Sequence, residues 1–184
     1  PENPKYFYVE PSLVFGFVPG IYPMRLPIDV GVKLPKKSRL IFQLHFTPRG
    51  KQVVVSVKVG LKLHRKKPPA EIKNMYVREK KFTIPPHAKN VKVSKAHLFK
   101  KPITIYGLAP HMHLRGKKMT FDLVYPSGEK KTLLKTSTYN FFWQNAYYFQ
   151  NPVKVPRGSR MIVTGWYDNS SDNVLNPNPN QEVV

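Results

Sequence analysis

The chain contains a series of short segments in which apolar residues either alternate with polar ones or cluster as β-branched and aromatic side chains. Both patterns are typical of β-strands, whose successive side chains point to opposite faces. The segments with these patterns are RLIFQLHF (39–46), KQVVVSVKVGLKL (51–63), PITIYGL (102–108), MTFDLVY (119–125) and SRMIVTGWY (159–167). Turn-forming residues separate these segments, and no segment keeps a helical period over three turns. The pattern therefore predicts an all-β protein, either a sandwich or a jelly roll.

One stretch of the sequence occurs twice. VKLPKKSRLIFQLHFTP (32–48) aligns without a gap on VKVPRGSRMIVTGWYDN (153–169), and Val, Lys, Pro, Ser and Arg recur at corresponding positions. Either a common turn-to-strand pattern arose twice, or the chain holds two related β-domains, and the shared register favours the second interpretation. The charged, proline-bearing stretch at 64–74 then marks the boundary. We expect an incomplete first domain over residues 1–70 and a second β-sandwich over residues 75–184.

The net charge of the chain bears on which partners the protein binds. The 184 residues include 31 Lys plus Arg against 10 Asp plus Glu, a formal net charge of +21. A charge of this size attracts polyanions, although dispersed lysines can also form an ordinary solvated surface. An acidic polymer or an acidic protein is therefore a candidate partner. Nucleic acid is the least favoured partner, because the chain shows no nucleic-acid-binding motif.

The absence of cysteine excludes disulfides and thiolate metal ligands. No apolar run reaches about 18 residues, so the sequence predicts no transmembrane segment. The opening residues, PENPKYFYVEP, show no signal-peptide pattern. If the protein is exported, we expect its signal to have been removed or to lie upstream.

Two histidines stand one residue apart in LAPHMHLRGKKM (108–119). On a strand, residues i and i+2 share a face, so His111 and His113 would offer two imidazoles to one point while Met112 faces away. Neutral imidazole suits copper, zinc, iron or nickel. The alternative is a pair of ordinary strand histidines. His45, in the middle of a predicted strand, is by its surroundings alone a hydrogen-bonded core residue.

Five motifs, taken together, carry a resemblance to a known family. They are QLHF (43–46), PHMHLRGK (110–117), NFFWQNAYYF (140–149), YDNSSDN (167–173) and NPNPNQEV (176–183). As a set they resemble the copper type II, ascorbate-dependent monooxygenases, which include peptidylglycine α-hydroxylating and dopamine β-monooxygenases, and in particular their bacterial relatives. The resemblance implies tandem jelly-roll sandwiches, one copper in each domain, and a secreted or periplasmic location.

The resemblance also implies ligands and a reaction. In this family the second-domain copper is held by a His-x-His pair and a methionine, which maps the pair onto His111 and His113. The first-domain copper takes an adjacent histidine pair plus the histidine of a Gln-x-His strand, which maps onto His45 with Gln43 beside it. Ascorbate would reduce both coppers, and the second-domain copper would use O2 to hydroxylate a C–H bond. A soft methionine sulfur favours Cu(I) in such a site.

The chain departs from the family pattern at both copper sites. No His-His pair occurs, and all five methionines precede the position where the methionine ligand is expected. Neither copper site is therefore complete in this chain. We expect a fragment truncated at both ends. The alternative is a degenerate, non-catalytic member, a basic β-sandwich that binds an acidic partner.

The substrate position departs as well. Peptide-amidating members carry an arginine two residues before the His-x-His pair that binds the peptide carboxylate, and Ala109 stands there in this chain. A glycine-extended peptide is therefore not the expected substrate. Arg115, on the same face of the expected strand as the histidines, is a candidate for binding another anionic group.

Overall fold

The computed structural model describes residues 14–18, 23–46 and 50–184. These residues contain no helix, which confirms the predicted all-β class. The strands are β1 (Val30–Gly31), β2 (Ala70–Glu71), β3 (Val91–Leu98), β4 (Ile103–Leu108), β5 (Gly116–Val124), β6 (Lys130–Thr136), β7 (Tyr147–Val155) and β8 (Arg160–Tyr167). Across these described ranges, no helix is available to span a bilayer.

The chain divides into two compact units. Unit 1 takes residues 1–15 and 23–74, and unit 2 takes residues 16–22 and 75–184. In unit 1, β1 pairs in parallel with β2. The ring of His64 makes a 3.1 Å hydrogen bond to the carbonyl of Val30, which is buried.

The prediction of strands at 39–46 and 51–63 is wrong, because the structure has no strand in either segment. Neither segment enters a hydrogen-bonded ladder, and their large apolar side chains lie exposed. The exposed fraction is 72% for Ile41 and 95% for Val54. A strand needs a paired neighbour and a layer that covers its apolar face. The alternating pattern is present in both segments, but the described part of unit 1 supplies neither requirement.

The repeated sequence does form the same turn twice. Ser38 donates its N–H to the carbonyl of Pro35, and Ser159 donates to the carbonyl of Pro156, both at 3.3 Å. The residue before each serine has a positive φ, 61° at Lys37 and 88° at Gly158. The second turn leads into β8, whereas no strand follows the first.

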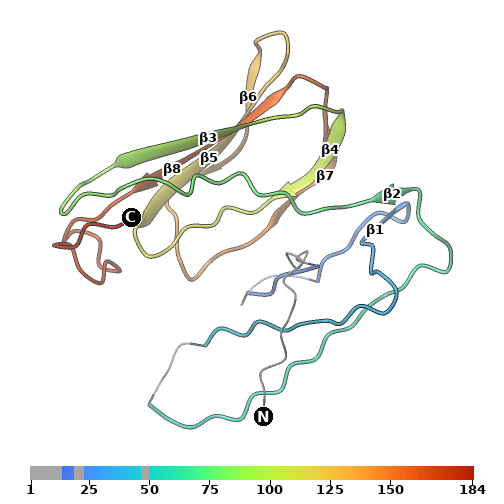
Figure 1. Cartoon of the computed structure of the whole chain (residues 1–184), viewed down its shortest axis with the longest axis horizontal. Coiled ribbons are helices and arrows are strands. Elements are labelled where there is room, and N and C mark those ends of the chain that lie inside the picture. The colour runs from blue at the N-terminus through green and yellow to red at the C-terminus, as the bar shows by residue number, and fades with distance from the viewer. Residues whose placement is uncertain (1–13, 19–22, 47–49) are drawn as a thin grey trace. The chain divides into compact units, whose positions relative to one another are not determined.

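Unit 2 contains a four-stranded antiparallel sheet, in the order β3-β8-β5-β6, and a two-stranded sheet of β4 and β7 (Figure 1). One face of the larger sheet supplies Met119, Phe121 and Leu123 from β5 together with Met161 and Val163 from β8. Val155 of β7 belongs to the same buried cluster, and neighbouring β4 residues pack against it. The apolar core of unit 2 therefore lies between its two sheets, as in a sandwich.

Three of the predicted strands are confirmed, since 102–108, 119–125 and 159–167 match β4, β5 and β8. The predictions missed β3, β6 and β7. β7 contains Pro152 and, among the described strands, pairs with β4 alone; a sheet edge tolerates proline because one side of the strand needs no donor. Six described strands in unit 2 are fewer than the eight of a jelly roll, so that topology stays a prediction.

Candidate functional site

The His-x-His pair lies in the segment between β4 and β5, just before β5 begins, and not on a strand as expected. The alternation that the sequence suggested is nevertheless present. Met112 is only 3% exposed, while His111 and His113 are both exposed. The two imidazole rings have their centroids 5.2 Å apart and are nearly perpendicular, at 86°. The spacing is compatible with two ring nitrogens that each lie about 2 Å from one metal ion.

A single phenol holds the backbone between these histidines. The hydroxyl of Tyr139 donates to the carbonyl of Met112 at 2.6 Å and accepts from the N–H of Met112 at 3.0 Å. Tyr139 is itself buried, and its N–H donates to the carbonyl of Lys117 at 2.8 Å. Burial raises the pKa of Tyr139, although the bond to Met112 opposes that rise. The phenol therefore keeps the proton that it donates.

Gln144 fixes the ring of His111. The side-chain amide N–H of Gln144 donates to the carbonyl of Phe141 at 2.7 Å, which leaves its Oε1 facing Nδ1 of His111 at 2.5 Å. An amide oxygen only accepts, so Nδ1 of His111 must carry the hydrogen. In the neutral imidazole this tautomer leaves the lone pair on Nε2, the atom that a metal-binding histidine would offer.

Gly116, the first residue of β5, makes room for this arrangement. A Cβ there would lie 2.6 Å from Cβ of Met112 and 3.0 Å from the ring of Tyr139. The N–H of Gly116 donates to the carbonyl of His113 at 2.8 Å, which closes the turn into β5. The side chain of Met112 thus occupies the space that a larger residue at 116 would take.

The loop after β8 is hydrogen-bonded to Arg115, two residues after His113. Asn169, fully buried, accepts from Nε of Arg115 at 2.6 Å and donates to the carbonyls of Pro85 and Gln181. Arg115 also donates to the carbonyl of Asn178 at 3.2 Å. The guanidinium of Arg115 therefore ties this loop to the turn after the histidines, and its predicted role toward an anion stays a prediction.

Asp168 begins the same loop. Its Oδ1 accepts from both the N–H and the hydroxyl of Ser170, at 3.0 and 2.6 Å, and its Oδ2 accepts from Lys117 at 3.3 Å. Burial pushes the pKa of Asp168 upward, but the bonds from Ser170 and the ammonium of Lys117 leave it below the ordinary value. The YDNSSDN motif is therefore a hydrogen-bonded turn.

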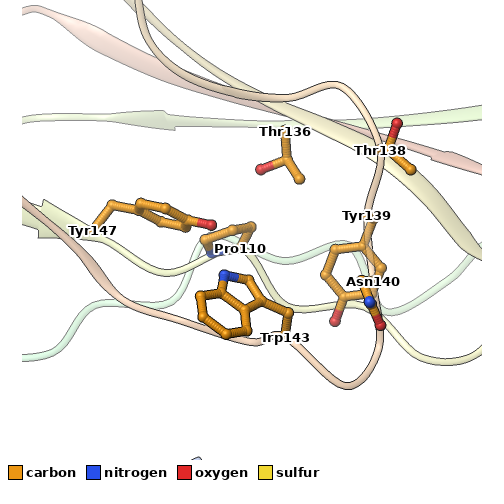
Figure 2. Close-up of a pocket in the computed structure, with 7 residues that line it drawn as sticks. All are labelled: Pro110, Thr136, Thr138, Tyr139, Asn140, Trp143 and Tyr147. Atoms are coloured by element: carbon orange, nitrogen blue, oxygen red, sulfur yellow. The ribbon is translucent and has the colours of Figure 1, made fainter. Parts of the chain in front are cut away.

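A pocket of about 400 Å³ lies next to Tyr139, and neither histidine of the pair is among its lining residues. Its lining comprises Pro110, Thr136, Thr138, Tyr139, Asn140, Trp143 and Tyr147, shown in Figure 2. Pro110 directly precedes His111, and Trp143 directly precedes Gln144. The described lining is aromatic and polar, and it contains no charged side chain.

The remaining predicted site residues lie in unit 1. Gln43 and His45 are both exposed. Within the described ranges, no three His, Cys, Asp or Glu side chains come together as a metal-binding group. Met112, Met119 and Met161 are buried core residues of unit 2, so none of these three sulfur atoms is free to act as a ligand.

Sequence reasoning missed Tyr139 and Gln144 as supports of the histidines. Both belong to the stretch TYNFFWQ (138–144), which precedes β7. In the sequence most of this stretch served only as part of one of the motifs that carry the family resemblance. The signal available was the glutamine itself, a polar residue that ends an otherwise aromatic run.

The chain matches a known protein family over more than half of its length. The model of the C-terminal domain of the copper type II ascorbate-dependent monooxygenases matches residues 70–176. No curated protein matches the chain. The matched range includes the His-x-His pair, Tyr139 and Gln144, the residues of the site described above.

Proposed function

The chain belongs to the copper type II ascorbate-dependent monooxygenase family, and from that premise we propose that His111 and His113 hold its oxygen-activating copper. The observation that carries the proposal is the pair of exposed, nearly perpendicular imidazoles, one of which has its Nε2 freed by Gln144. Copper bound there would supply the exchange of single electrons that activates O2 for C–H hydroxylation, with ascorbate as reductant.

The residues around the pair have positioning roles in this proposal. Gln144 holds His111 in the tautomer that offers Nε2. Tyr139 fixes the backbone of Met112, the residue between the two histidines. Such partners of metal-binding histidines orient the ring and raise its basicity. The protein thereby prepares two ligands before metal arrives.

We assign the electron-donating copper to unit 1, with His45 as one ligand and Gln43 beside it. The repeated turn at Pro35–Ser38 and Pro156–Ser159 supports a common origin for the two units, because both sequence and backbone conformation recur. Under this assignment residues 1–70 are the C-terminal part of the first copper domain. The location proposed for the protein, secreted or periplasmic, follows from the family alone.

The pocket lined by Pro110, Tyr139 and Trp143 favours an uncharged substrate. Its lining offers aromatic faces, hydroxyls and one amide, and the described part of it holds no cation that could pair with a carboxylate. Ala109 replaces the arginine that the resemblance associates with peptide binding. A neutral organic molecule with a flat apolar portion therefore fits better than a peptide acid.

A Cu(I) titration of the 184-residue chain tests the copper proposal. We expect the His111→Ala/His113→Ala double variant to lose tight copper binding, while His97→Ala on β3 retains it. His97 is a suitable control because its ring packs against Phe99 in the same unit. Copper binding that survives the double substitution unchanged would contradict the proposal.

A second candidate function is a non-catalytic basic domain that binds an acidic partner. The net charge of +21 favours it.

A further inference from the structure

The face of the four-stranded sheet that points away from the core carries a second pocket. It measures about 380 Å³ and is lined by Lys118, Thr120, Asp122, Lys130, Thr132, Lys135, Thr136 and Trp166. We call it the lysine-threonine pocket. We propose that it binds an acidic polysaccharide through the carboxylates and hydroxyls of its sugar rings. This site goes beyond the copper proposal, does not depend on it, and gives the second candidate function a location.

The register of the strands explains why these residues meet. Trp166 of β8 lies between Lys118 of β5 and Lys92 of β3, and Thr120 of β5 pairs with Lys135 of β6. Next along β5, Asp122 pairs with Thr132. Alternate residues of paired strands share one face, so all of these side chains lie opposite to the buried Met119, Phe121 and Leu123.

Two lysines of the pocket keep their charge available. Lys130 is paired with Asp122, at 3.0 Å. Lys118 and Lys135 have no carboxylate partner within the described ranges. The ammonium of Lys118 lies 4.5 Å from the centroid of the Trp166 ring, which fixes a cation beside a flat apolar surface. Lys92, exposed at the neighbouring position on β3, extends the positive surface beyond the pocket.

Asp122, the one acidic residue in the described lining, is bonded to two neighbouring residues of the pocket. The hydroxyl of Thr132 donates to Oδ1 of Asp122 at 2.6 Å, while Lys130 contacts Oδ2. Burial raises the pKa of Asp122, but these two partners outweigh that effect and leave the pKa below its ordinary value. Asp122 therefore stays ionised and neutralises Lys130, and it leaves Lys118 and Lys135 to attract an anion.

The chemistry of the lining favours an acidic sugar over other polyanions. Threonine hydroxyls both donate and accept, which matches sugar hydroxyl groups, and ammonium groups match carboxylates. Single-stranded nucleic acid binds on a series of aromatic platforms, whereas Trp166 is the one aromatic residue in the described lining. An acidic protein partner would need apolar anchor pockets, and this lining has no aliphatic side chain.

The test measures binding of polygalacturonate to the full chain by isothermal titration calorimetry, with uncharged dextran and polyuridylate RNA as comparison polymers. We expect polygalacturonate to bind and dextran not to bind. The Lys118→Gln/Lys135→Gln variant should bind polygalacturonate at least 10-fold more weakly. Lys100→Gln/Lys101→Gln, which removes the same charge from the exposed turn between β3 and β4, should change the affinity less than 2-fold.

A further variant checks that the sugar and not charge alone is recognised. Trp166→Phe keeps all charges and should weaken polygalacturonate binding several-fold, while an unchanged far-ultraviolet circular dichroism spectrum of the same variant shows that unit 2 is folded. Equal losses in the two double-lysine variants would overturn the proposal, because binding would then follow net charge. Tighter binding of the RNA than of polygalacturonate would overturn the choice of ligand.

Discussion

At the scale of single residues, the site is defined by how side-chain amides and hydroxyls hold two histidines. His111 and His113 could be recognised in the sequence because two imidazoles one residue apart are a metal-ligand pattern. Their orientation could not, since it depends on Gln144 and Tyr139, which lie about 30 residues further along the chain. No local pattern in the sequence predicts a contact across that separation.

Replacing Gln144 tests whether it orients the ring of His111. In Gln144→Leu the ring of His111 loses its acceptor, so both tautomers become populated, and we expect Cu(I) affinity to fall about 10- to 100-fold. Nitrogen-15 NMR of the metal-free chain should show the Nδ1–H signal of His111 weaken. Gln150→Leu, the same change at an exposed position of β7, is the control. Unchanged affinity and an unchanged tautomer in Gln144→Leu would contradict the positioning role.

At the scale of elements, the outcome depends on whether a strand finds partners. The segments 39–46 and 159–167 carry related sequences, and both follow the same turn, yet only the second is a strand. β8 forms because β3 and β5 pair on its two sides and because Met161 and Val163 enter a shared core. Alternation in a sequence predicts which residues can face a core. It does not show whether that core is present.

The start of β5 provides a test at this scale. Gly116→Ala places a methyl group against Met112 and Tyr139, so we expect unit 2 to lose about 1–3 kcal/mol of unfolding free energy and to bind copper more weakly. Gly60→Ala is the control, because no atom lies within 4 Å of the added carbon there. Thermal unfolding followed by tryptophan fluorescence reports on unit 2, which contains both Trp143 and Trp166. Equal stability of Gly116→Ala and the unmodified chain would contradict the described packing.

At the scale of the whole molecule, lysines greatly outnumber acids, and the carboxylates that they or other donors contact contribute to the pH dependence of stability. Asp122 and Asp168 have pKa values below their ordinary range for the reasons given above, and the side-chain hydrogen bond from Lys95 lowers the pKa of Glu79 to about 2. In each case the folded state binds its proton less readily than the unfolded state. The stabilisation is therefore present above about pH 4, the ordinary carboxyl pKa, and is lost as pH falls through the lowered values.

We accordingly expect the fluorescence-detected stability of unit 2 to decrease steadily from pH 5 to pH 2. Asp168→Asn should lower stability at pH 7 by about 1–3 kcal/mol, since its amide nitrogen cannot accept the bond from Lys117 and its neutral oxygen is a weaker acceptor for Ser170 than a carboxylate. The same variant should depend less on pH, because one of the responsible carboxyls is gone. Urea unfolding across this pH range measures both effects. A variant as acid-sensitive as the unmodified chain would show that Asp168 does not contribute.

The central claim is that His111 and His113 bind one copper ion together. X-ray absorption spectroscopy of the Cu(I)-loaded His45→Ala chain tests it most directly, because that variant removes the histidine proposed for the other copper. The proposal predicts scattering from two imidazoles per copper, lost when His111 and His113 are replaced by alanine. Copper with no imidazole scattering, or with scattering that persists in the alanine variant, would contradict it.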